Sequence, residues 1–258
     1  MLTISAPKVA GFTPRWAPFP GFSLLFDSLG TPYRREGVFE TLVCDVARDP
    51  ALGFYRRVYE GFARFNFDRL LNTYLFCSLP PASYHVTAFD VANQGDLTHC
   101  RADCLDSLKE LLAQVPENGW STDHLLLGPA CQSSLATQPW NLRLRYGKLD
   151  MFGRGGISLQ LQGADEESVQ TLDQVRKARA ELSMSYQERF GVGAGVRFTP
   201  HLSVGYFANA EGAELASGHI VEWDARLREY VGDEVLTFET ASLHAFTSME
   251  TFIRRVAN

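Results

Sequence analysis

Two kinds of hydrophobic pattern divide the chain into expected strands and helices. Short alternating or continuous apolar runs, typical of strands, occur at residues 22–29, 38–46, 72–78, 85–91, 141–152, 157–162, 197–207, 235–246 and 251–256. Apolar residues recur at helical spacing over residues 50–65, 103–115 and 165–189, and more weakly over 220–230. Strands and helices mixed in this order predict an α+β fold.

The pattern fits a single domain over residues 1–258. With 45% apolar residues, a chain of 258 residues can bury a sizeable core. Residues 1–21 carry four prolines and two glycines, which predict an irregular leader on the surface. Beyond residue 70, a strand, a motif-bearing strand, a loop and a helix occur twice, in halves of about 70–138 and 139–258. We therefore expect a rough two-fold arrangement.

Two of the expected strands carry the same polar pattern, a histidine followed two residues later by a hydroxyl residue. The first stretch is Ser83-Tyr84-His85-Val86-Thr87-Ala88-Phe89, and the second is Thr199-Pro200-His201-Leu202-Ser203-Val204-Gly205. Side chains alternate between the two faces of a strand. Each strand would therefore bury an aliphatic face and present an imidazole beside a hydroxyl on the other.

Two such strands laid side by side would provide the groups that hydrolyse a phosphodiester. One imidazole can take a proton from water while the other gives a proton to the leaving oxygen. The two hydroxyls can donate hydrogen bonds to the non-bridging oxygens, where charge accumulates. Neither step requires a metal. The plainer interpretation is that His85 and His201 are two ordinary half-buried strand histidines, but the matching strand contexts favour a paired site.

The two stretches resemble the paired His-x-[Thr/Ser]-x motifs of the 2H phosphoesterase superfamily, which includes RNA 2′,3′-cyclic phosphodiesterases and the so-called 2′-5′ RNA ligases. The run from Leu79 to Asp90 is similar to the first motif of a bacterial branch whose substrate is not generally assigned. The resemblance covers residues 70–255 and leaves about the first 65 unmatched. It implies two lobes of mostly antiparallel sheet, helices outside, and an active-site cleft between the lobes.

Charge and cysteine content restrict the partners and the compartment. The net charge of −6 argues against a protein that grips long duplex nucleic acid, unless basic residues gather at one cleft. It favours a small nucleotide or an RNA end as the substrate. Five irregularly spaced cysteines suit a reducing cytoplasm. No run of 18 apolar residues exists, so we expect no membrane span, and we expect a cytoplasmic monomer.

Other chemistry-bearing residues are weaker candidates. His99, Cys100, Asp103 and Cys104 lie close together, but no second cluster with zinc spacing exists, so we expect neither a metal nor a cofactor. The glycines at residues 191–195 stand after a helix and before a strand, which is the wrong order for a dinucleotide fingerprint.

Several residues near the motifs are candidate substrate contacts. Arginine side chains suit phosphate oxygens, and aromatic rings can stack on a nucleobase. The candidates are Arg143, Arg145 and Arg197, together with Tyr84 and Phe89. A solvated outer face is the plainer interpretation for the first two arginines, and core packing is the plainer one for the aromatic residues. Tyr206 falls on the face of Leu202 and Val204 by simple alternation, which favours packing.

The sequence therefore predicts a metal-independent cyclic phosphodiesterase of the 2H type. His85 and His201 would be its acid and base, in an order that the sequence leaves open, and Thr87 and Ser203 would hold the phosphoryl oxygens. A binding protein that captures a nucleotide or RNA end without turnover is the alternative. A structural domain without a small ligand would be favoured only if the two motifs lay far apart.

Overall fold

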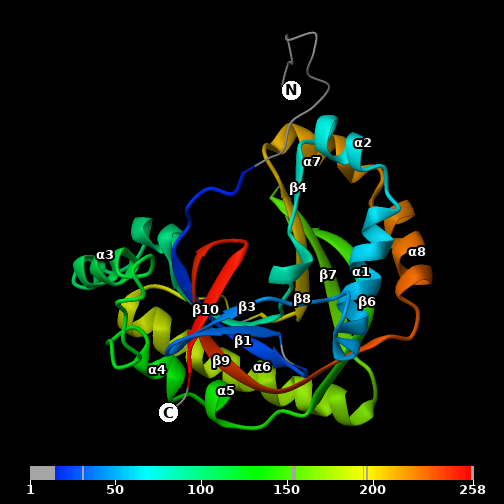
Figure 1. The fold of residues 1–258 in the computed structure, drawn as a ribbon. Coiled ribbons are helices and arrows are strands. Elements are labelled where there is room, and N and C mark those ends of the chain that lie inside the picture. Colours follow the sequence, from blue (N-terminus) through cyan, green and yellow to red (C-terminus); the bar gives the residue numbers. More distant parts are fainter. Residues whose placement is uncertain (1–14, 31, 153–154, 194, 196, 257–258) are drawn as a thin grey trace.

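Antiparallel strands make up the centre of the protein (Figure 1). The computed structural model describes residues 15–256 apart from 31, 153–154, 194 and 196, and in this part ten strands form one sheet, every pairing of which is antiparallel. The strands are β1 (Gly21–Ser28), β2 (Tyr33–Glu36), β3 (Phe39–Leu42), β4 (Phe76–Ser78), β5 (Thr87–Asn93), β6 (Leu142–Phe152), β7 (Gly156–Gly163), β8 (His201–Phe207), β9 (Val235–Ser248) and β10 (Thr251–Arg255). The predicted α+β class with a mostly antiparallel sheet is confirmed.

The long strand β9 joins two groups of strands. On one side it pairs with β1, which in turn pairs with β5. It also pairs with β10, from which β3 and β2 follow in order. It also pairs with β6, from which β7, β8 and β4 follow in order. The early strand β4 thus lies with the second motif strand, and the late strand β9 lies with the first, so each group draws on both halves of the sequence.

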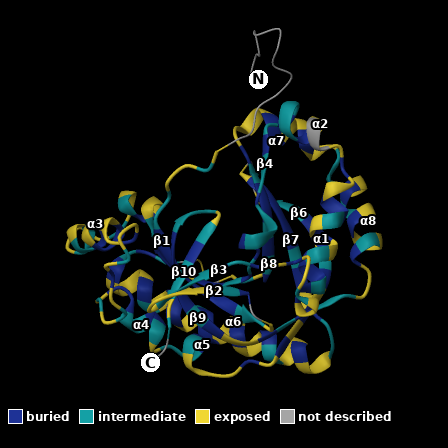
Figure 2. Ribbon diagram, in the orientation of Figure 1, coloured by how far each residue is buried: buried dark blue, intermediate teal, exposed yellow. Residues whose placement is uncertain are grey.

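Helices lie outside the sheet (Figure 1). They are α1 (Gly53–Ala63), α2 (Phe67–Asn72), α3 (Leu105–Ala113), α4 (Gly128–Cys131), α5 (Ser134–Thr137), α6 (Glu166–Phe190), α7 (Ala210–Ser217) and α8 (Ile220–Val231), with 3-10 turns at Pro50–Leu52, Pro81–Ser83 and Gln94–Thr98. Helix α8 packs on β6 and on α1, whereas α4 and α5 pack on β9. Figure 2 shows the buried residues on the strands and on the inward sides of these helices.

Local signals fixed the helix ends where the sequence carried them. The Asp49 side chain accepts a hydrogen bond from the Ala51 amide, and the Asp165 side chain accepts one from the Ser168 amide, so both act as N-caps. Gly191 ends α6 with a positive φ of 70°, which glycine adopts without strain.

The departures from the expected elements have physical causes. Strand β2 carries the exposed Arg34 and Arg35 and therefore lacks an apolar run. The strand expected at 38–46 ends at Leu42, and the one expected at 72–78 begins only at Phe76, because α2 continues to Asn72. Helices α2, α4, α5 and α7 are too short to show helical periodicity. Of the expected leader, residues 1–14 lie outside the described part, and Gly21 already belongs to β1.

A partly buried ion network fastens β10 to its neighbours. Arg254 of β10 bonds Asp27 of β1 at 2.7 Å and Glu40 of β3 at 2.9 Å. The ring of Tyr33 lies 3.6 Å from its guanidinium carbon, and the Tyr33 hydroxyl lies 3.0 Å from Asp27. Because two carboxylates and a ring share one guanidinium, removing it would leave buried charge unpaired.

Strand β6 contains a bulge at Gly147. Tyr146 pairs with Leu161 and Lys148 pairs with Gln160, so Gly147 has no partner of its own. A Cβ atom at Gly147 would lie 2.7 Å from the Gln160 carbonyl oxygen, which is closer than real Cβ contacts allow. Only glycine fits without moving the backbone of β7.

Replacing Gly147 by alanine should destabilise the fold by about 1–3 kcal/mol, because the new methyl group collides with backbone atoms. The measurement is urea unfolding, compared with Gly218→Ala. Gly218 follows α7, has an ordinary helical φ, and would place its Cβ in open space. Equal midpoints for the two variants would contradict the bulge as a packing constraint.

Candidate active site

The two motif strands meet at one pair of residues. Val86, directly before β5, forms an antiparallel bridge with Leu202 of β8. In an antiparallel register, this pairing sets His85 across from Ser203 and Thr87 across from His201. Val86 and Leu202 are fully buried, whereas all four motif residues are partly exposed. The structure therefore brings both imidazoles and both hydroxyls together on one face.

Both imidazoles are oriented by the same backbone contact. His85 Nδ1 lies 2.7 Å from the Ser83 carbonyl oxygen, and His201 Nδ1 lies 3.0 Å from the Thr199 carbonyl oxygen. A carbonyl oxygen can only accept, so Nδ1 carries the proton in each ring. No other group in the described part of the chain bonds Nε2 of either ring. Both Nε2 atoms are thus left for a ligand.

The surroundings of the two imidazoles differ. The ring of Phe252 lies 4.2 Å from the ring of His85, at an angle of 53°. Burial, and to a smaller extent the nearby His201, lowers the pKa of His85 to about 4 against the opposing effect of the Ser83 carbonyl. His85 is therefore a neutral imidazole at pH 7. His201 opens β8 at a partly exposed position.

Strand β7 extends the polar face beyond the second motif. Gln160 pairs with His201, and Ser158 pairs with Ser203. Residues directly opposite one another in an antiparallel pair share a face. Gln160 and Ser158 therefore stand beside His201 and Ser203, and β8 separates them from the first motif.

The face assigned to Tyr206 by simple alternation was wrong. The β7–β8 register shifts between Ile157 and Ser158, so that Val204 is an extra residue in β8. The bulge turns Tyr206 to the face of Ser203. Burial raises the pKa of Tyr206, and the nearby Ser203 hydroxyl opposes that shift. A single-residue insertion of this kind leaves no signal in an alternating sequence pattern.

Aromatic rings surround Tyr206. Trp16 lies edge-on to it at 5.8 Å, and Phe152 lies edge-on at 5.4 Å. Phe19, three residues after Trp16, stacks on Phe246 of β9. The described end of the leader, residues 15–20, thus contacts both groups of strands. It supplies half-exposed aromatic surface next to the Ser203 side of the motif face.

Two of the candidate substrate contacts belong to the core. Tyr84 is 3% exposed and packs edge-on against Tyr55, and Phe89 is fully buried against Tyr186 of α6. Their rings fill the interior on the far side of the first motif strand, so they are unavailable to a ligand. Packing, the plainer interpretation, holds for both.

The candidate arginines are all exposed, but their environments differ. Arg143 forms an ion pair of 2.5 Å with Asp165, the N-cap of α6. Arg145 has no partner in the part of the chain that the structure describes. Arg197 lies on the segment that leads into β8. Of the three candidates, Arg143 alone has its guanidinium paired within the described residues, and those of Arg145 and Arg197 have no partner there.

Arg179 of α6 is a functional candidate that the sequence analysis missed. Its side chain is 7% exposed, and it donates to the Ala88 carbonyl oxygen at 3.0 Å and to the Arg197 carbonyl oxygen at 3.3 Å, as well as to that of Gly195. One buried guanidinium thereby ties the first motif strand to the segment before the second. Its position in the inward series of α6, between Val175 and Leu182, was the available signal.

A third histidine, His244, makes the same Nδ1 contact with a backbone carbonyl, but its Nε2 is also bonded within the protein. His244 is fully buried, its Nδ1 lies 3.0 Å from the Ser242 carbonyl oxygen, and its Nε2 lies 3.2 Å from the Tyr33 hydroxyl. Burial lowers the pKa of this histidine. Because its second nitrogen is already bonded inside the protein, His244 serves the structure.

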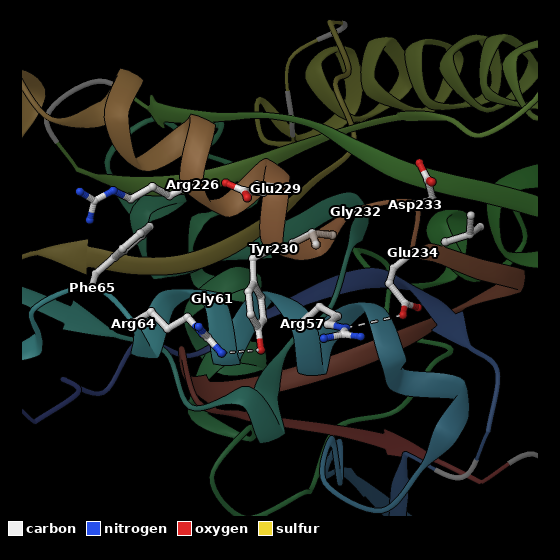
Figure 3. Close-up of a pocket in the computed structure, with 12 residues that line it drawn as sticks. Arg57, Gly61, Arg64, Phe65, Arg226, Glu229, Tyr230, Gly232, Asp233 and Glu234 are labelled. Carbon is white, nitrogen blue, oxygen red and sulfur yellow. Dashed lines mark hydrogen bonds and ion pairs between the residues drawn. The ribbon is translucent and has the colours of Figure 1, made fainter.

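Neither the stretch from His99 to Cys104 nor the open hollow beside α1 offers acid–base groups comparable to those of the two motifs. In the described residues, no three His, Cys, Asp or Glu side chains gather as metal ligands would, and none of the helices there could cross a membrane. A hollow of about 940 Å³ lies between α1 and α8 (Figure 3). Its cations are committed: Arg57 pairs with Glu234 at 3.8 Å, and Arg64 lies 4.4 Å from the ring of Tyr230.

Comparisons with known proteins reveal likeness in fold. No protein-family model and no curated protein matches the chain. The structure is similar to that of ATU0111 from Agrobacterium tumefaciens str. C58, described as a conserved protein of unknown function, with a TM-score of 0.50 and 13% identity over 93% of this chain and 86% of that one. It also matches Usb1 of Kluyveromyces marxianus, with a TM-score of 0.39 and 12% identity over 92% and 98% of the two chains. The chain thus shares its fold with ATU0111.

Proposed function

We propose that this protein is a phosphodiesterase that hydrolyses a 2′,3′-cyclic phosphate, or a related ribose-linked phosphodiester of a nucleotide or RNA end. The observation that carries the proposal is the Val86–Leu202 bridge, which places two imidazoles with free Nε2 atoms beside two hydroxyls on one face. Two imidazoles suffice for the acid and base steps of phosphodiester hydrolysis.

The different surroundings of the two histidines support an assignment of roles. His85, neutral at pH 7, takes a proton from water through Nε2, and the water oxygen forms a bond to phosphorus. The bond from phosphorus to the departing ribose oxygen breaks, and His201 gives that oxygen its proton. His201 suits the acid role because its partly exposed position allows it to carry charge and to be recharged from solvent.

The hydroxyls and the neighbouring rings complete the substrate site. Thr87 and Ser203 donate to the non-bridging phosphoryl oxygens, where negative charge increases as the water attacks. The exposed surface of Trp16 and Phe152 beside Tyr206 supplies a flat apolar contact for a nucleobase.

Replacing either His85 or His201 by alanine should lower the rate of hydrolysis by about 10²-fold or more, because each removes one of the two proton transfers. The measurement is phosphorus NMR in excess chelator, with a panel of 2′,3′-cyclic nucleotides and a short RNA ending in a cyclic phosphate. The new monoester resonance also identifies the product isomer.

His99→Ala is the matched control for these variants. His99 is exposed, pairs with Asp96 at 3.0 Å, and lies outside the motif face, so its loss should leave the rate unchanged. Losses of only a few-fold in both motif variants would refute two-histidine catalysis. Tight nucleotide binding by wild type with no new resonance would instead indicate a binding protein.

The pH dependence of kcat/KM should be bell-shaped with an unusually low acid limb. The base must be neutral, so activity is lost as the pH falls through the His85 pKa of about 4. The alkaline limb follows because a general acid must still hold its proton. The long-range ¹H–¹⁵N spectrum of labelled protein follows His85 directly. An acid limb and a His85 titration near the ordinary pKa of about 6.5 would contradict the assigned roles.

A further inference from the structure

Two cations of β6 lie on the same face as the second motif. In the strand register, Lys148 of β6 lies opposite Gln160 of β7, and Gln160 lies opposite His201 of β8. These residues therefore form one row across three strands. Arg145 pairs with Gln162, two residues further along β7 and therefore on the same face as Gln160. The polar face that holds His201 and Ser203 thus continues into a row of basic side chains.

The bulge at Gly147 makes this arrangement possible. Arg145 and Lys148 are three residues apart, and in a regular strand they would point to opposite faces. The unpaired Gly147 shifts the alternation by one, so both side chains stand on the motif face while Tyr146 and Leu149 are buried beneath. Arg228 of α8 donates to the Gly147 carbonyl oxygen at 2.7 Å and holds the bulge from the other side.

The two cations are accessible and differently held. Both side chains are exposed. The Lys148 ammonium lies 2.9 Å from Oδ2 of Asp150, and the Gln160 side chain donates to the same oxygen at 2.5 Å. The ammonium is therefore held close to the row that ends at His201. Arg145 has no partner among the described residues and is free to bind an anion.

Spacing decides which anion these groups can reach. Neighbouring strands lie about 4.8 Å apart, so the backbones of Lys148 and His201 are separated by about 10 Å. That is too far for Lys148 to share the phosphate held between the two motifs. It suits a second phosphate, carried by the next nucleotide of the same chain. Arginine and lysine are the side chains that hold backbone phosphates without reading sequence.

We propose that Arg145 and Lys148 form a subsite for a second phosphate, and that the substrate is therefore the end of a single-stranded RNA rather than a mononucleotide. The inference rests on the proposed function for the position of the scissile phosphate. The overall charge of −6 does not oppose it, because the subsite needs only Arg145 and Lys148, which stand together on the motif face. Two cations are too few for a long nucleic acid and suffice for a short end.

The test measures binding apart from catalysis. A fluorescent 2′-O-methyl RNA hexamer ending in a 3′-phosphate cannot react through a 2′-hydroxyl, and its affinity is followed by anisotropy over a range of NaCl concentrations. Arg145→Ala and Lys148→Ala should each weaken binding about fivefold at low salt, and each should reduce the slope of log K against log[salt] by about 0.7, the value for one contact to single-stranded phosphate.

Arg226→Ala is the matched control, because it removes the same charge from α8, which packs on the opposite face of β6. It should keep the wild-type affinity and slope. A hexamer that fails to bind wild type, or that binds the two strand variants with wild-type affinity and slope, would overturn the subsite.

A kinetic comparison separates this inference from the proposed function. For Arg145→Ala, the ratio of kcat/KM on a trinucleotide ending in a cyclic phosphate to that on a cyclic mononucleotide should fall about fivefold. Hydrolysis with an unchanged ratio would refute the subsite and leave the phosphodiesterase standing. Salt-dependent binding through Arg145 without any hydrolysis would refute the phosphodiesterase and leave the subsite standing.

Discussion

The pairing of Val86 with Leu202 is the contact on which the candidate site depends. Each residue is fixed to its own group of strands: the Val86 carbonyl oxygen accepts from the Phe26 amide at 2.9 Å, and Leu202 pairs with Leu159. The bridge thereby closes a circuit that runs through β5, β1, β9, β6, β7 and β8. Because both side chains are fully buried, the hydrophobic effect holds the bridge together from beneath, and the polar groups above need contribute nothing to its stability.

The sequence predicted the local geometry of each motif but not the relation between the motifs. A period of two is enough to set His85 with Thr87, and His201 with Ser203, on common faces. The crosswise placement, in which each histidine stands opposite the other motif's hydroxyl, depends on strand register, which is set by long-range packing. The bulges at Val204 and Gly147 each reverse the alternation once. The hydrophobic pattern gave no sign of the first, and an isolated glycine within the strand was the signal for the second.

The hydrophobic pattern also failed to predict the partners of buried polar side chains. Arg179 occupies a core position of α6 and satisfies its guanidinium with backbone carbonyls of two separate segments. Helical spacing placed it inward, but the partners that make such burial tolerable come from residues far away in the sequence. His244 is comparable: it makes the same kind of backbone contact as the two motif histidines, and its complete burial and the Tyr33 hydroxyl at its Nε2 distinguish it from them.

An antiparallel bridge has a two-fold axis through its centre, and here that axis passes between Val86 and Leu202. Rotation about it exchanges His85 with His201 and Thr87 with Ser203, so a phosphate centred over the bridge meets equivalent groups from either side. The motifs alone therefore cannot give the reaction a direction. That asymmetry is imposed from outside them, by Phe252 of the C-terminal strand, which covers one imidazole and leaves its counterpart open to solvent.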